Sequence, residues 1–147
     1  MPVKIDDVMK RMLGLAFEDG VPPIIGTATK EGRPQVSPKG TLRVFDDETL
    51  CYWERGYRTS YAALLENPHI VVYYRNQARA KEMPFRNGAL RFHGVARLAT
   101  SETDKNTVWN QCPAQEQGRD PERKGAAILI RIDLIEDLAG KVICQRD

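Results

Sequence analysis

The chain has 147 residues, 41% of them hydrophobic and 29% charged, and its 22 basic and 20 acidic residues give a formal net charge of +2. This length supports one folded core, so we expect residues 1–147 to form a single domain. The near-neutral charge argues against a protein that neutralises a nucleic-acid backbone, and the composition gives no sign of disorder.

The positions of the cysteines and histidines limit which disulfides and metal sites the chain can form. Cys51, Cys112 and Cys144 lie far apart without a Cys-x-x-Cys spacing, and His69 and His93 complete no metal-binding pattern. We therefore expect no disulfide framework and no metal site, but three reduced thiols in a cytoplasmic protein. The amino-terminal segment is charged throughout, unlike a signal peptide, and no segment approaches the roughly 20 apolar residues of a membrane span.

The first predicted element is an amphipathic helix over Asp6–Phe17, whose apolar residues recur three and four positions apart. Asp6 or Asp7 is suited to cap its start. Short polar turns then separate three β-prone segments, which we expect to form an antiparallel meander: Ile24–Thr29, Gln35–Phe45 and Thr49–Glu54.

A short helix is expected next, with Thr59 or Ser60 as its N-cap and an Asn-Pro pair at its end. The polar Asn76–Asn87 segment is predicted to be a mobile connection. The other expected elements are strands His69–Arg75 and Ala89–Ala99 (curved at Gly94), a helix from Thr100 or Ser101 to about Gln111, a polar loop Ala114–Gly125, and strands Ala126–Leu134 and Val142–Cys144. This predicts a mostly β fold of about six antiparallel strands with two or three short helices, and so many strands in a small domain favour a closed barrel.

Two segments are candidates for a binding site. In an extended PQVSPKGTLRV segment, one face carries two cations and two hydroxyls that could bind phosphate: Ser37, Lys39, Thr41 and Arg43. Gly40 would let a ligand approach the main chain closely. The same alternation is typical of a solvent-facing strand, and the pattern alone favours that interpretation.

The second segment is the start of the short helix, at Arg58 and Thr59. Helix N-termini offer unpaired N–H groups to an anion, and Arg58 adds a planar fork of donors. The alternative is an ordinary capping sequence with an exposed arginine. The two segments gain weight together, because the expected meander returns the helix start towards the Ser37–Thr41 strand.

The order of these segments resembles the FMN-binding split-barrel family related to pyridoxamine 5'-phosphate oxidase. The matching features are an I-G-T strand, a G-R-P turn, an S-P-K-G strand, a D-D-x-T-L turn, an R-T-x-x-x-L-x-x-N-P helix and an R-F-x-G-x-A strand, which together span about residues 22–99. The resemblance implies a homodimer of six-stranded antiparallel split β-barrels, with FMN at the subunit interface.

The same resemblance implies a cofactor site composed of Ser37, Lys39, Gly40, Thr41, Trp53, Arg58 and Thr59. In it, Arg58 and Thr59 hold the FMN phosphate, with Ser37 and Lys39 nearby. This chain has Arg-Thr where many oxidases of the family have Arg-Lys, and it lacks their carboxy-terminal Arg-Leu-x-Pro segment. We therefore expect a related oxidoreductase that acts on another small planar substrate or electron acceptor.

Several alternatives remain open at this stage. The chain could be a flavin carrier without turnover, or it could bind a deazaflavin or haem in the same fold. Haem is disfavoured because the chain has only two histidines. A nucleic-acid-binding barrel is disfavoured by the charge balance. No catalytic residue can be assigned from spacing, and Glu54 and Arg55 carry little weight as ligand contacts.

Overall fold

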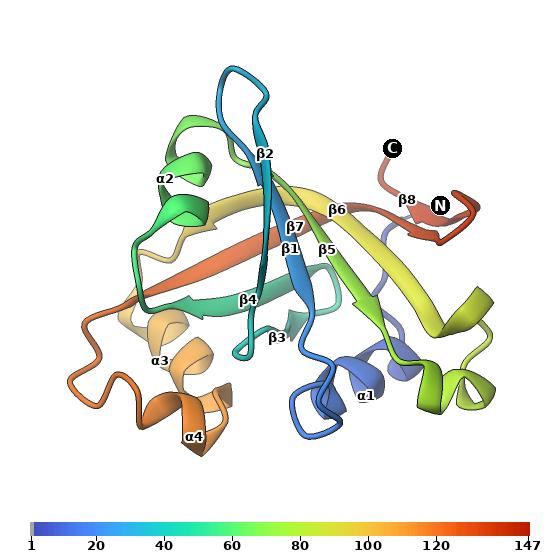
Figure 1. Cartoon of the computed structure of the whole chain (residues 1–147), viewed down its shortest axis with the longest axis horizontal. Coiled ribbons are helices and arrows are strands. Elements are labelled where there is room, and N and C mark those ends of the chain that lie inside the picture. The colour runs from blue at the N-terminus through green and yellow to red at the C-terminus, as the bar shows by residue number, and fades with distance from the viewer. Residues whose placement is uncertain (1) are drawn as a thin grey trace.

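A computed structural model of the protein describes residues 2–147 (Figure 1). Within this range the strands are β1 (Ile24–Ala28), β2 (Pro34–Pro38), β3 (Arg43–Asp46), β4 (Thr49–Glu54), β5 (His69–Arg75), β6 (Ala89–Leu98), β7 (Ala126–Asp137) and β8 (Val142–Gln145). The α-helices are α1 (Asp7–Leu15), α2 (Thr59–Glu66), α3 (Glu102–Gln111) and α4 (Ala114–Gln117), and the 3-10 helices are η1 (Gln77–Glu82) and η2 (Arg86–Gly88). No helix among residues 2–147 has the length and hydropathy that crossing a membrane requires.

The strands form one antiparallel sheet in the order β2-β1-β5-β6-β7-β4-β3, with β8 paired to β7. Figure 1 shows this sheet curling into a split barrel, with α1 packed at one end and α3 and α4 together at another side. The mostly β split-barrel prediction is confirmed, although the described chain has eight strands where six were expected.

The core lies inside the curled sheet and continues under α1. Met9, Met12 and Leu13 of α1 are almost fully buried and belong to the same hydrophobic cluster as Ile25 of β1. The Asp6 carboxylate accepts the Met9 main-chain N–H at 2.9 Å, so Asp6 is the N-cap of α1. The helix ends at Leu15, two residues before the expected end.

The expected strand Gln35–Phe45 is wrong, because the chain turns in its middle. β2 ends at Pro38, and the next main-chain N–H, that of Lys39, bonds to the Pro23 carbonyl at 2.8 Å. Leu42 N–H then closes a turn onto the Lys39 carbonyl. Proline supplies no main-chain donor, which favours this strand ending. The three-strand meander is therefore also wrong: β2 and β3 lie at opposite ends of the strand order.

The predicted helix caps, strand curvature and polar connections agree with the structure only in part. The N-cap of α2 is Arg58, and Thr59 and Ser60 are already helical. The Ser101 hydroxyl caps α3 by accepting Asp104 N–H, as predicted. Gly94 was expected to be the point where the strand curves, and the pairing of β6 with β7 shifts register between His93 and Gly94, a kind of irregularity that bends a strand. The two segments read as polar connections contain η1, η2 and α4.

Gly94 and Gly14 offer a matched pair of substitutions. A Cβ on Gly94 would collide with the main-chain carbonyl of Arg131, whereas a Cβ on Gly14, in α1, meets nothing within 4 Å. We expect Gly94→Ala to lower the free energy of unfolding by about 1–3 kcal/mol through overpacking. Gly14→Ala should raise it by about 0.5 kcal/mol. Urea unfolding of both variants checks this, and equal effects would contradict the close approach at Gly94.

Candidate functional site

An open cleft of about 950 Å³ lies where the end of β2, the turn before β3, the end of β4 and the start of α2 meet. All seven residues that the family resemblance implied line this cleft: Ser37, Lys39, Gly40, Thr41, Trp53, Arg58 and Thr59. Arg43, the fourth residue of the expected polar strand face, is not among the lining residues, because the turn at 39–42 carries it away onto β3.

The start of α2 forms the exposed end of the cleft. Arg58, its N-cap residue, makes no side-chain capping bond, so no side chain of the cap satisfies the first N–H groups of the helix. The Arg58 and Thr59 side chains are exposed, and Ser60 is buried at the same end. Within residues 2–147 no carboxylate pairs with the Arg58 guanidinium. This end of the cleft is therefore able to receive an anion.

Glu54 forms the floor of the cleft at the end of β4 and is only 3% exposed. Its Oε1 lies 3.3 Å from Lys39 Nζ and 3.5 Å from Ser60 Oγ, and its Oε2 accepts Gly56 N–H at 3.2 Å. The Lys39 ammonium also lies 5.3 Å from the centre of the Tyr52 ring. Lys39 is thus held in an ion pair that ties the turn after β2 to the start of α2.

Thr41 and Trp53 join the same turn to β4. The Thr41 hydroxyl accepts Trp53 N–H at 2.9 Å and donates to the Trp53 carbonyl at 3.1 Å. The Trp53 indole N–H in turn donates to Asp120 at 2.8 Å. Burial raises the pKa of Asp120, but its bonds from Trp53, Lys124 and Gly125 together hold that pKa below its ordinary value. Trp53 is therefore fixed at both its main chain and its ring.

Sequence reasoning missed part of the lining. Glu116 and Arg119 come from the segment read as a polar loop, where α4 brings them to the cleft. A Cβ on Gly40 would lie 2.5 Å from Glu116 Oε1, so the neighbour that Gly40 admits is this carboxylate. No spacing in the sequence could have linked α4 to Gly40. Glu54 and Arg55, to which sequence reasoning assigned little weight as ligand contacts, also line the cleft, and the remaining lining residues are Phe17, Pro22, Gln35, Pro38, Gly56 and Ser60.

The charge of the cleft is positive overall. Its lining holds four cationic side chains, Lys39, Arg55, Arg58 and Arg119, against the carboxylates of Glu54 and Glu116. One cation is neutralised by Glu54, so the excess lies towards α2 and α4. A negatively charged group on a mostly uncharged ligand would fit this distribution.

Cysteine chemistry does not contribute to the cleft. Burial raises the pKa of the Cys51 thiol to about 12 and that of the Cys112 thiol to about 11, and neither residue lines the cleft. Such thiols remain protonated near neutral pH and are poor nucleophiles. Across residues 2–147, no cluster of three His, Cys, Asp or Glu side chains is arranged to hold a metal ion.

Comparisons with known proteins identify relatives. A family model described as pyridoxamine 5'-phosphate oxidase matches residues 22–137, from just before β1 to the end of β7. No curated protein sequence matches the chain.

Many solved structures share the fold. HupZ from Group A Streptococcus is 22% identical, with 94% of this chain and 97% of that chain covered and a TM-score of 0.67. An FMN-binding protein from Syntrophomonas wolfei is 12% identical, with 90% and 86% covered and a TM-score of 0.64. HutZ, described as the heme storage protein from Vibrio cholerae, is 17% identical, with 82% and 89% covered and a TM-score of 0.53.

The buried pair of Lys39 and Glu54 can be tested by its removal in steps. The two side chains are 16% and 4% exposed, so Lys39→Met leaves an unpaired carboxylate in the protein interior. We expect a loss of about 3 kcal/mol in the free energy of unfolding, most of it recovered in the Lys39→Met/Glu54→Gln double variant. Urea unfolding measures both.

The control for this experiment is Lys124→Met, which removes the exposed ion pair with Glu122. Exposed pairs contribute little, so no measurable change is expected there. If Lys39→Met cost no more than this control, the pair would not hold the floor of the cleft.

Proposed function

The chain belongs to the pyridoxamine 5'-phosphate oxidase family, and on that premise we propose that it binds FMN in the cleft described above and acts as an oxidoreductase on a small planar substrate or electron acceptor. FMN, when bound, supplies the redox chemistry, since its ring system accepts and returns electrons. The protein's own residues hold and orient it.

The observation that carries this proposal is the start of α2, where no side chain caps the helix and no carboxylate among residues 2–147 pairs with Arg58. A phosphate placed there would receive main-chain N–H bonds and the guanidinium fork of Arg58, with the Thr59 hydroxyl as a further donor. These residue types match what a phosphate monoester requires, so the donor set fits FMN.

The rest of the cofactor would extend along the cleft from this anion-binding end. Ser37, the turn at Gly40 and Thr41, and Trp53 would line it there. We assign Lys39 an indirect role, because its ammonium is already bound to Glu54 and so fixes the turn on which the cofactor rests. By family resemblance, a second copy of the chain would cover the open face of the cleft in a homodimer.

Haem is the second candidate, because one structural neighbour is described as a heme storage protein. Its iron would need an axial ligand, and His69 and His93 both lie outside the cleft, in a groove across β1, β5 and β6. His93 is also bonded to Glu136, with 3.0 Å between Nε2 and Oε1. The cleft therefore favours a flavin over haem.

The absorbance spectrum of the purified protein, followed by release and identification of any chromophore, tests the ligand. FMN is expected. Haem or a deazaflavin in its place, or a colourless protein that fails to take up added FMN, would overturn the proposal. Oxidation of a reduced nicotinamide by the FMN-loaded protein then separates an oxidoreductase from a flavin carrier without turnover.

Arg58→Ala tests the phosphate contact. A hydrogen bond to a charged group contributes about 1.5–3 kcal/mol, so we expect FMN affinity to fall at least about tenfold. The urea midpoint should not change, because Arg58 has no charged partner within residues 2–147. Flavin fluorescence titration measures the affinity, with Arg33→Ala, in the exposed β1–β2 turn, as the control. Unchanged affinity in Arg58→Ala would remove Arg58 from the site.

A further inference from the structure

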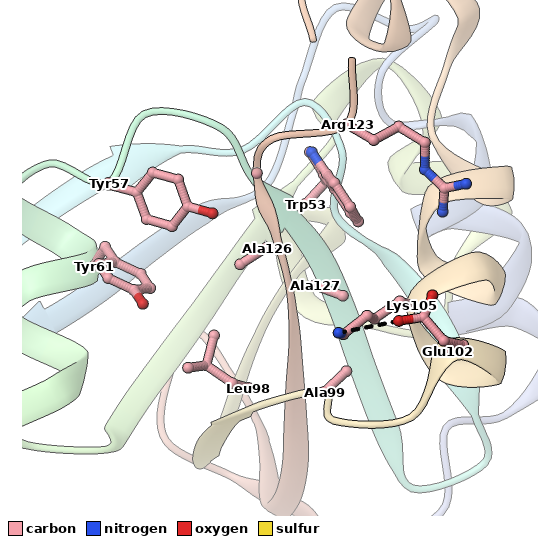
Figure 2. A pocket seen from close by; sticks show the side chains of 11 residues that line it. Trp53, Tyr57, Tyr61, Leu98, Ala99, Glu102, Lys105, Arg123, Ala126 and Ala127 are labelled. Carbon is pink, nitrogen blue, oxygen red and sulfur yellow. Dashed lines mark hydrogen bonds and ion pairs between the residues drawn. The ribbon is translucent and has the colours of Figure 1, made fainter. Parts of the chain in front are cut away.

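Figure 2 shows the residues of a second hollow, of about 520 Å³, next to Trp53. It is formed where the start of β7, the end of β6, the first turn of α3 and the residues around the start of α2 meet. Trp53 lines both this hollow and the cleft. The proposed function makes no use of it, and its volume is within the range of small-molecule sites.

Aromatic rings and small side chains shape the hollow. Tyr57 and Tyr61 stand on the α2 side, with ring centres 4.8 Å apart and nearly perpendicular. The Tyr57 hydroxyl donates to the Lys124 carbonyl at 2.7 Å, which fixes that ring against the segment before β7. The start of β7 contributes only Ala126 and Ala127 to the lining, so space remains above the strand for a flat group (Figure 2).

Arg123 supplies a positive charge at the rim, in a strained conformation. Its φ of 54° is in the left-handed region, which costs a non-glycine residue energy. The guanidinium donates to Asn106 at 2.7 Å and stacks over the Trp109 ring at 5.1 Å. No carboxylate forms an ion pair with it in the part of the chain that the structure describes.

The other charged side chains at the rim, Glu102 and Lys105, do not offset the positive charge of Arg123. Lys105 lies 3.4 Å from Glu102, so these two largely neutralise each other. Figure 2 shows this pair on the α3 side of β7, facing the hollow. The lining thus combines aromatic and small apolar side chains with the charged Glu102, Lys105 and Arg123, and it carries one net positive charge.

We propose that this hollow binds a small planar aromatic carboxylate. The ring would lie against Trp53 and Tyr57, and the carboxylate would pair with the preorganised guanidinium of Arg123. The proposal does not depend on FMN binding, because none of these residues except Trp53 lines the cleft.

The probe is 2-naphthoate, titrated into the purified full-length protein labelled with ¹⁵N. The chain has two tryptophans, so the two indole N–H resonances report separately on Trp53 and Trp109. We expect the Trp53 resonance to shift with saturation. The neutral isostere 2-naphthamide and the non-aromatic cyclohexanecarboxylate should each bind at least tenfold more weakly.

Three variants locate the site. Arg123→Asn removes the charge with a residue that tolerates the left-handed region, and should weaken 2-naphthoate binding at least tenfold. Ala126→Leu fills the hollow and should abolish the shift. Arg119→Ala removes a side chain that lines the cleft but not the hollow, and should leave the affinity unchanged.

Three results would overturn the proposal. The first is no binding at millimolar 2-naphthoate, as would occur if another copy of the chain covered the hollow. The second is binding that survives both Arg123→Asn and Ala126→Leu. The third is binding lost in Arg119→Ala but retained in Arg123→Asn, which would place the probe in the cofactor cleft.

Discussion

A buried carboxylate needs a cation and hydrogen-bond donors, because removing its charge from water is costly. Glu54 finds them in three different segments: Lys39 in the turn after β2, Gly56 after β4, and Ser60 in the first turn of α2. The need to pair the Glu54 carboxylate thus brings the end of β2, the end of β4 and the start of α2 together, although β2 and β4 are not neighbours in the strand order. The cleft is the space that remains above the point where they meet.

Local signals predicted the elements well, because their causes are local. The capping aspartate of α1, the capping serine of α3 and the bounds of β5 all follow from residues within a few positions. Local signals failed at Pro38, whose missing N–H ends β2 while the polar alternation around it favoured one long strand. They also misplaced the N-cap of α2 and missed the short helices η1, η2 and α4. The seven site residues nevertheless share one cleft, because Lys39 and Thr41 are each bonded to β4.

The unpredicted part of the site comes from long-range contacts. Glu116 and Arg119 follow α3, more than sixty residues after β4, and only the packing of α3 and α4 beside the barrel brings them to the cleft. The pairing of Asp120 with the Trp53 indole is of the same kind. Sequence motifs span a few neighbouring residues and therefore do not predict contacts between residues more than sixty positions apart. The family likeness shows the fold, and on a shared fold the ligand depends on side chains such as these.

Strand β2 has a consequence for how copies of the protein behave at high concentration. It lies at one end of the strand order, begins at Pro34 and ends at Pro38, and carries Val36 74% exposed between them. An exposed apolar edge strand is a template on which another chain can add and start aggregation. The two prolines each remove a main-chain donor from this short edge. Pro38, which ends β2 before the turn that lines the cleft, therefore also protects the sheet against edge-to-edge association.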